Sequence, residues 1–249
     1  MKIDILTIFP QMFAGPFDES MIKRAKEKHL VQIRIHDLRS WANDKHKTVD
    51  DRPYGGGPGM VLMIPTIFDA LESLKSEARN PKSEINSRSQ IHNSKTKKSR
   101  VILLTPQGRV FDQQKARFLS RLDHLILIAG HYQGVDERVR DHLVDEEISI
   151  GDYVLTGGEI PAMVVTDAVV RLIPGVLGDS HSLDLESFST IGNDSPRLLE
   201  YPQYTRPENF KDWKVPQVLV SGNHAEISRW RESQSRKRTQ TRRPELLRK

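Results

Sequence analysis

The chain has 249 residues, enough for one large domain or two smaller ones, and it contains no cysteine. The lack of cysteine excludes disulfide-stabilised folds and thiolate metal sites, and it agrees with a reducing compartment. No apolar run reaches the length of a membrane helix, and the first ten residues do not resemble a signal peptide. We therefore expect a cytoplasmic protein with no membrane partner.

The formal net charge of +5 is unevenly distributed. Residues 76–100 contain seven Lys or Arg against two Glu, and residues 229–249 contain nine against two. Basic segments on an otherwise acidic chain indicate a polyanionic partner contacted at particular places, although solvated basic tails would give the same pattern. Because residues 76–100 are also rich in Ser, Asn and Lys, we predict a disordered basic insertion there.

The first third of the chain predicts alternating strands and helices. Residues 2–8 and 31–36 alternate apolar and polar side chains, as half-buried strands do. Residues 11–29 predict a helix interrupted at Gly15-Pro16, and residues 65–74 predict a short helix with one apolar face.

Residues 43–60 predict no regular element, because they end with four glycines and two prolines in eight residues. The segment also carries Lys45, His46, Lys47, Arg52 and Tyr54. This composition suits a loop that closes over nucleic acid or phosphate, and a disordered surface loop is the alternative.

From residue 101 the chain repeats one unit. Apolar strands at 101–104, 125–129 and 148–150 alternate with helical patterns at 110–122 and 135–143. This alternation predicts an α/β fold with a parallel sheet and crossover helices. Each strand ends in a turn that contains Gly or Pro, so the three turns should meet at the carboxyl edge of the sheet. Open α/β sheets bind ligands at that edge.

The third turn, residues 149–161, holds Gly151, Gly157 and Gly158. Its glycines alone would fit a tight structural turn, and the two similar turns upstream favour a ligand site. The following helix, residues 160–173, is apolar nearly all round, which predicts burial in a core or a subunit interface. Within it, Asp167 and Arg171 are spaced for an i,i+4 ion pair.

The remaining chain predicts a second domain. Residues 177–196 lose their apolar side chains and are expected to link a first domain, 1–176, to a small helical domain, 197–249. The best helix of that domain should start at Asn223, a favourable N-cap. We expect it to place Ile227 and Trp230 inward, and Arg229 and Arg231 outward.

Five stretches together resemble the TrmD family of bacterial tRNA (guanine-N1)-methyltransferases. They occur in the family's order over nearly the whole chain: residues 50–60, 149–161, 173–178, 204–207 and 219–224. The resemblance implies a SPOUT fold with a C-terminal trefoil-knot cofactor site. It also implies a homodimer with active sites between subunits, S-adenosylmethionine as donor, and the guanosine at position 37 of tRNA, next to the anticodon, as acceptor.

The resemblance implies that the three turns hold S-adenosylmethionine. It also implies that the tRNA anticodon arm is contacted at two other places, one of which is the C-terminal helical tRNA-binding domain, 197–249. The implied cofactor-binding residues are Leu104, Thr105, Pro106, Gly108, Gly130, Tyr132, Gln133, Ser149, Ile150, Gly151, Asp152, Tyr153, Val154, Leu155, Gly157, Gly158 and Pro161. The implied tRNA-binding residues are His46, Asp50, Arg52, Tyr54, Gly59, Ser221, Asn223 and His224.

The chemistry of guanine determines which catalytic groups its methylation at N1 needs as a minimum. Its N1 carries a proton, so methylation needs a base within reach, and the negative charge that moves towards O6 can be stabilised by a fixed arginine. By resemblance, Arg171 is the catalytic arginine. The base is Glu186 of Glu186-Ser187-Phe188, where the family has aspartate. Asp184 is the alternative base.

Two further positions depart from the family pattern. Gln133 stands where the family usually has Glu, so Mg²⁺ is only a candidate cofactor, and His131 replaces an Arg. These departures motivate an alternative function, a tRNA-binding SPOUT-fold protein with weak or lost methyltransferase activity. A methyltransferase with a different RNA target is a third hypothesis, and the matching C-terminal motifs disfavour it.

Overall fold

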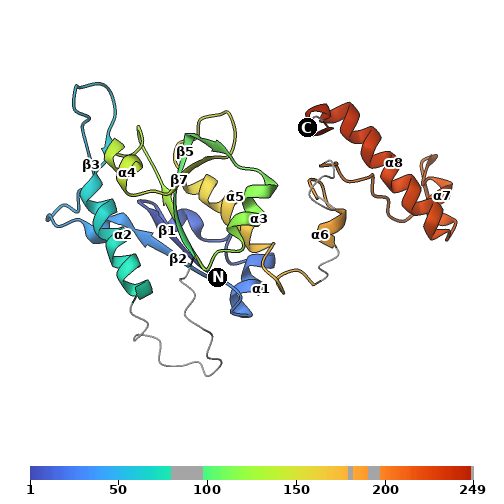
Figure 1. Cartoon of the computed structure of the whole chain (residues 1–249), viewed down its shortest axis with the longest axis horizontal. Coiled ribbons are helices and arrows are strands. Elements are labelled where there is room, and N and C mark those ends of the chain that lie inside the picture. The colour runs from blue at the N-terminus through green and yellow to red at the C-terminus, as the bar shows by residue number, and fades with distance from the viewer. Residues whose placement is uncertain (80–97, 179–181, 190–196, 248–249) are drawn as a thin grey trace. The chain divides into compact units, whose positions relative to one another are not determined.

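The computed structural model describes residues 1–79, 98–178, 182–189 and 197–247. The chain divides into two compact units, Met1–Leu177 and Gly178–Lys249 (Figure 1). The boundary falls where the sequence loses its apolar side chains.

A parallel sheet forms the centre of the first unit, which confirms the predicted α/β class. Within the described residues its order is β2-β1-β6-β5-β7. Its register places Ile5 between Ile35 and Leu127 of the neighbouring strands. The strands are β1 (Lys2–Thr7), β2 (Gln32–Asp37), β5 (Ser99–Val110), β6 (His124–Ala129) and β7 (Glu146–Ser149).

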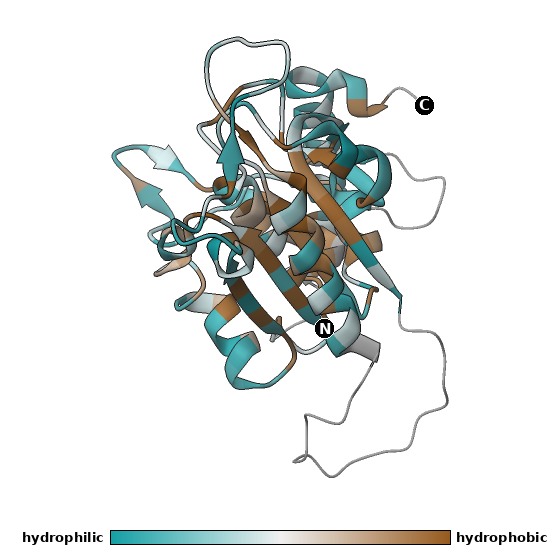
Figure 2. Ribbon diagram, turned by 90° about the vertical axis from the view of Figure 1, so that its left-hand side faces the viewer, coloured by the Kyte–Doolittle hydropathy of each residue, from teal (hydrophilic) through white to brown (hydrophobic). Residues whose placement is uncertain are grey.

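Helices cover both faces of this sheet, as Figure 1 shows. One core packs α1 (Ser20–Glu27), α3 (Gln113–Leu119) and α5 (Glu159–Val170) on the sheet. The other core packs α2 (Ile64–Arg79) and α4 (Glu137–His142), together with the short helix η2 (Leu38–Trp41). The middle strands are buried on both faces, so residues 101–104 of β5 and 125–129 of β6 are all apolar, and they belong to the brown centre of the unit in Figure 2.

The turn predicted at residues 105–108 is a bulge inside β5. Leu104 and Arg109 both lie opposite Ile148, so the four residues between them leave the ladder while the strand continues to Val110. The helix predicted from residue 110 therefore begins only at Gln113. The side chain of Asp112 caps it by accepting a hydrogen bond from the Lys115 backbone N–H at 2.8 Å.

The interruption predicted at Gly15-Pro16 is confirmed, because residues 14–19 separate η1 (Pro10–Phe13) from α1. Two other predicted segments differ from the structure. The glycine-rich segment is closed by a short antiparallel pair, β3 (Asp50–Asp51) and β4 (Val61–Leu62). The predicted disorder over 76–100 is wrong at both ends, because α2 continues to residue 79 and β5 begins at residue 99; residues 80–97 lie outside the described residues.

The second unit is mainly helical and also contains a hairpin that the sequence did not predict. Its turn residues Lys211 and Asp212 have φ of 51° and 65°, a pattern typical of type I′ turns that usually contain Asn-Gly. Its elements are α6 (Ser182–Leu185), β8 (Asn209–Phe210), β9 (Trp213–Lys214), α7 (Gln217–Val220), α8 (His224–Arg242) and η4 (Pro244–Leu247).

The α8 helix begins as predicted and packs differently from the prediction. Asn223 is its N-cap and accepts a hydrogen bond from the Glu226 backbone N–H at 3.3 Å. Arg231 was expected to point outward, but its guanidinium carbon lies 4.7 Å from the centre of the Tyr201 ring. An aromatic face therefore covers this arginine. The trefoil knot implied by the resemblance stays a prediction.

Candidate active site

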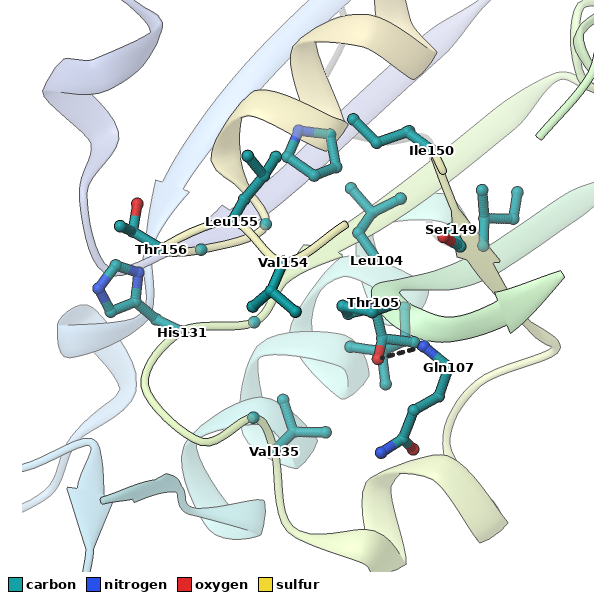
Figure 3. Close-up of a pocket in the computed structure, with 18 of the residues that line it drawn as sticks. Leu104, Thr105, Gln107, His131, Val135, Ser149, Ile150, Val154, Leu155 and Thr156 are labelled. Carbon is teal, nitrogen blue, oxygen red and sulfur yellow. Dashed lines mark hydrogen bonds between the residues drawn. The ribbon is translucent and has the colours of Figure 1, made fainter. Parts of the chain in front are cut away.

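A cavity of about 360 Å³ opens at the carboxyl edge of the sheet, where the three predicted turns meet (Figure 3). One wall is the β5 bulge around Thr105. The second is the loop after β6 around Tyr132. The third is the long loop from β7 to α5, which contains Val154 and reaches Pro161. The alternation of strands and helices was thus sufficient to predict that these segments converge.

Most of the predicted cofactor-binding residues line this cavity. Gly108 and Asp152 do not. A Cβ atom on Gly108 would lie 2.5 Å from the carbonyl carbon of Glu147, so this glycine allows the bulge to pack on β7. The sequence did not assign eight further lining residues: Leu103, Gln107, His131, Gly134, Val135, Arg140, Ile148 and Thr156. All but Arg140 lie within two residues of an assigned residue in the sequence. Arg140 comes from α4, and no sequence pattern pointed to it.

Backbone contact between the second and third loops fixes the cavity floor. The Gly158 N–H donates to the Gly130 carbonyl at 2.7 Å, and His131 and Gly157 form an isolated β-bridge. A Cβ atom on Gly158 would lie 2.7 Å from the Ala129 Cα, closer than any side chain can approach. Glycine is therefore required here for close packing of the two loops.

Arg140 holds the β5 bulge in place. Its guanidinium donates to Gln107 Oε1 at 2.7 Å and to Glu147 Oε2 at 2.5 Å. The Gln107 backbone N–H in turn donates to Thr105 Oγ1 at 3.3 Å, drawn as a dashed line in Figure 3. The first wall of the cavity is thus tied to α4 and β7 by charged hydrogen bonds.

The second loop is strained and is tied to the glycine-rich loop. Tyr132 has φ of 57°, an uncommon conformation for a residue with a side chain. The Gln133 N–H donates to the Met60 carbonyl at 3.0 Å, and the Leu62 N–H donates to the Gly134 carbonyl at 3.0 Å. The Gln133 side chain also covers Gly59, where a Cβ atom would lie 2.6 Å from its Cγ. The cavity and the glycine-rich loop are therefore in direct contact.

The cavity walls are mainly apolar. Leu104, Val135, Ile150, Val154 and Leu155 contribute side chains that Figure 3 labels. Among the described lining residues none is Asp or Glu. The cavity suits a ligand that buries apolar surface and meets backbone polar groups, and its own lining supplies no carboxylate base.

A buried carboxylate lies next to the floor of the cavity. Glu159, in the first turn of α5, is 1% exposed and accepts a hydrogen bond from Thr7 Oγ1 at 2.7 Å. His131 Nδ1 lies 3.5 Å from its other oxygen. The position at the start of a helix favours the negative charge. Glu159 thus fixes the start of α5, the helix that carries Pro161. No sequence pattern pointed to this residue.

The predicted tRNA-binding residues lie at two separate places. Arg52, Tyr54 and Gly59 are exposed on the glycine-rich loop between β3 and β4. His46 is exposed in the segment before β3, and Asp50 is partly buried in β3. In the second unit Ser221, Asn223 and His224 are exposed around the start of α8. Asn223 already has a structural role there as the N-cap.

The predicted catalytic residues do not lie in the cavity. Arg171 is the C-cap of α5, at the opposite end from Pro161. Because α5 has 12 residues, that end lies about 18 Å along the helix axis from its start. Glu186 follows α6 in the second unit and is partly buried, and Asp184 lies within α6. The pairing of Arg171 with either carboxylate stays a prediction.

The described residues form neither a metal-binding cluster nor a membrane-spanning helix. In the described part of the chain, no group of three or more His, Asp or Glu residues is arranged to hold a metal ion. None of the helices formed by the described residues combines the length and apolar composition needed to cross a bilayer.

Comparison with known proteins identifies the family. The family model described as tRNA (Guanine-1)-methyltransferase TrmD matches residues 1–249. The chain is 54% identical to the "tRNA (guanine-N(1)-)-methyltransferase" of Heliobacterium modesticaldum, over 99% of this chain and 84% of that protein. It is 52% identical to proteins with the same name from Bacillus cereus strain AH820 and Bacillus anthracis strain CDC 684, over 99% of this chain and 92% of each. The chain therefore belongs to the tRNA (guanine-1)-methyltransferase TrmD family.

Proposed function

We propose that this protein transfers a methyl group from S-adenosylmethionine to N1 of the guanosine at position 37 of tRNA, next to the anticodon. The observation that carries the proposal is the convergence of three family-matching turns on one cavity at the sheet edge. The proposal includes the cytoplasmic location and the knotted SPOUT topology that the resemblance implies.

The chemistry of the cavity lining supports S-adenosylmethionine as the donor. Its apolar walls suit an adenine ring and a sulfonium side chain, and its glycine-rich turns place backbone groups at the rim. The bound donor supplies an electrophilic methyl group. Thr105, Tyr132 and Gly158 belong to the three turns that would hold it. Mg²⁺ has no assigned ligand here, since Gln133 offers an amide where the family has a carboxylate.

A carboxylate base has to come from outside the cavity lining, because no described lining residue is Asp or Glu. Glu186 is the proposed proton acceptor for guanine N1, and Asp184 is the alternative. As N1 loses its proton, negative charge moves towards O6. In the proposed site the guanidinium of Arg171 would stabilise this charge.

A homodimer with active sites between subunits would explain the distance between Arg171 and the cavity of its own chain. Arg171 lies about 18 Å along α5 from the end that carries Pro161, so in the proposed homodimer a second copy would supply this arginine. The α5 helix also leaves Ile160 and Val164 45% and 42% exposed on one side. This apolar pair supports an interface between two copies.

The tRNA anticodon arm is the proposed partner of the exposed glycine-rich loop. Arg52 can pair with phosphate, and Tyr54 offers an exposed ring for stacking on an unpaired base. The target guanine would leave its stack to reach the donor, as bases do in enzymes that modify them. Because Gly59 lies against the Gln133 side chain, an RNA loop bound there would lie beside the donor cavity.

The decisive experiment replaces the proposed base. The full chain is incubated with S-adenosylmethionine and an unmodified tRNA transcript, and 1-methylguanosine is measured by mass spectrometry. We expect Glu186→Gln to lower the rate by about 10²–10⁴-fold, because the proton acceptor is lost. Asp184→Asn, the matched control, should retain activity, and the affinity for S-adenosylhomocysteine should be unchanged in both variants.

The outcome also decides between the two functions. A fully active Glu186→Gln variant with an inactive Asp184→Asn variant would transfer the role of base to Asp184. If wild-type protein binds the transcript without methylating it at any magnesium concentration, the alternative of a tRNA-binding protein holds. Two departures from the family, Gln133 and Glu186, motivate that alternative.

A further inference from the structure

The second unit contains a cavity of its own, of about 460 Å³. The segment after residue 200 forms one side of it, and α7 and the first half of α8 form the other. Tyr201, Tyr204, Leu219 and Ile227 contribute aromatic and apolar walls, whereas Arg206 and Arg231 contribute positive charge. None of the residues assigned to tRNA binding from the sequence lines this cavity.

Arg231 packs its guanidinium against a buried aromatic ring. The guanidinium carbon lies 4.7 Å from the centre of the Tyr201 ring, and Tyr201 is only 8% exposed. The Nε atom of Arg231 is buried without a hydrogen-bond acceptor, and Arg231 forms no ion pair with any residue that the structure describes. By contrast, Arg236, five residues further along α8, pairs with Glu232 at 3.1 Å. No described residue accepts a hydrogen bond from the terminal nitrogens of Arg231 either, and these nitrogens are not buried as its Nε is. An anionic acceptor in the cavity would therefore pair with them.

The aromatic side chains define what that ligand presents besides an acceptor. Tyr204 is 49% exposed, and its ring centre lies 6.4 Å from that of Trp230. Leu219 and Ile227 add apolar surface to the same cavity. Flat aromatic faces beside a guanidinium are the features with which proteins bind an unpaired nucleotide, by stacking its base and pairing its phosphate.

The charge of α8 agrees with such a ligand. The helix His224–Arg242 contains six Lys or Arg residues and two Glu. One acidic residue, Glu208, also lines the cavity and disfavours a bare anion. A nucleotide whose base lies along the aromatic wall meets less of that repulsion than free phosphate does.

We propose that this second-unit cavity is an additional RNA subsite that takes one unpaired nucleotide, with its base beside Tyr204 and its phosphate on Arg231. The proposal rests on the proposed function, which makes tRNA the substrate. It adds a contact that grips RNA away from the donor cavity and selects for an unstacked position in the RNA.

The first test compares variants of one helix. We measure the affinity of the full chain for an unmodified tRNA transcript with Arg231→Ala, Tyr204→Ala and the control Arg236→Ala, at one fixed salt concentration. Loss of one stacked and paired nucleotide should weaken binding by about tenfold or more for the first two variants. Arg236→Ala removes an exposed charge and its surface ion pair with Glu232, so we expect about a twofold effect.

Two further measurements test whether the variants are folded. The circular dichroism spectrum and the affinity for S-adenosylhomocysteine should be unchanged in all variants, which shows that both units are folded. If Arg231→Ala fails to fold, Arg231→Lys retains the charge and the aliphatic stem, and its affinity for the transcript decides instead. Equal affinities for Arg231→Ala and Arg236→Ala would overturn the subsite alone, whereas a wild-type chain that binds no tRNA would overturn the proposed function as well.

The second test asks whether the base is needed. Uridine 5′-monophosphate and inorganic phosphate are titrated separately into the protein saturated with S-adenosylhomocysteine, and the indole N–H resonance of Trp230 is followed. We expect the nucleotide to shift this resonance at concentrations where phosphate does not. Equal shifts from phosphate would identify a simple anion site, and no shift from either ligand would also contradict the nucleotide subsite.

Discussion

The two units of this protein are stabilised in different ways. The first unit buries two large apolar clusters, one on each face of its parallel sheet. In the described part of the second unit, the buried residues are Tyr201, Ser235 and Thr239, of which two are polar. Thr239 Oγ1 accepts a hydrogen bond from the Leu199 N–H at 2.8 Å and donates to the Ser235 carbonyl at 2.7 Å.

The two kinds of packing predict different rigidity and different sensitivity to mutation in the two units. A dense core gives the cavity of the first unit a fixed shape, because close-packed strands resist deformation. The second unit depends on single hydrogen bonds and on arginine–aromatic contacts, each of which contributes little by itself. We therefore expect changes in the first unit to cost the most stability, and changes in the second to be local.

The largest effect is expected from a buried charge in the sheet. Asp4 is fully buried and lies 2.6 Å from His124, 2.7 Å from His36 and 2.7 Å from Arg34. Because Asp4→Asn leaves these groups without their carboxylate, we expect a loss of about 3 kcal/mol in the free energy of unfolding. Urea denaturation at pH 7 measures it. The exposed ion pair of Asp18 provides the control, and Asp18→Asn should change the midpoint little.

The pH dependence checks the cause. Burial raises the pKa of Asp4, but hydrogen bonds with His124, His36 and Arg34 lower it, and together they hold this pKa well below its usual range. The folded state then binds fewer protons than the unfolded state, so the stabilisation is present above about pH 4, where the unfolded carboxyl ionises, and is lost below it. The urea midpoints of wild type and Asp4→Asn should converge as the pH falls below about 4. Parallel midpoints down to pH 3 would contradict this origin.

An intermediate effect is expected at the cavity floor. Gly158→Ala forces a Cβ atom to within 2.7 Å of the Ala129 backbone, so the second and third loops must separate. Overpacking of this kind costs about 2 kcal/mol, and we expect affinity for S-adenosylhomocysteine to fall by at least about tenfold. Calorimetric titration measures that affinity. Gly178→Ala is the control, since nothing lies within 4 Å of its added Cβ; a Gly158→Ala variant with normal affinity would show that this contact does not shape the site.

The smallest effect is expected in the second unit. Thr239→Val keeps the side-chain shape but removes the hydroxyl, which leaves the Leu199 N–H without its acceptor. A lost hydrogen bond of this kind costs about 1 kcal/mol, so amide hydrogen exchange in α8 should become about fivefold faster. Exchange in the sheet should stay the same, and Thr239→Ser should behave as wild type. Faster exchange throughout the chain would show that the two units unfold together.

Much of the first unit could be predicted from the sequence. The alternation of apolar strands and helices was enough for the parallel sheet and for the meeting of three turns at one edge. Where prediction failed, local composition was ambiguous. Pro106 and Gly108 are typical of a turn, yet Arg140 holds them as a bulge within β5 through contacts made 33 residues apart in the chain.

The second unit was less predictable, because its contacts give weaker patterns. A hairpin turn made of Lys211 and Asp212 lacks the usual Asn-Gly signal. Arg231 follows the pattern of a surface residue, and only the structure shows its guanidinium over Tyr201. The position of Glu159 was missed for a related reason: a carboxylate in the first turn of a helix is usually exposed, and here Thr7 and His131 surround it.

The contact between Gly59 and Gln133 constrains how this chain can change over time. A side chain at position 59 would collide with Gln133 Cγ at 2.6 Å, and the positive φ of 86° at Gly59 adds a second obstacle. A substitution that enlarges position 59 is tolerable only if position 133 becomes shorter or turns away. The two positions, 74 residues apart, are therefore expected to accept mutations as a pair, so the choice of amide or carboxylate at 133 is inherited together with the glycine that faces it.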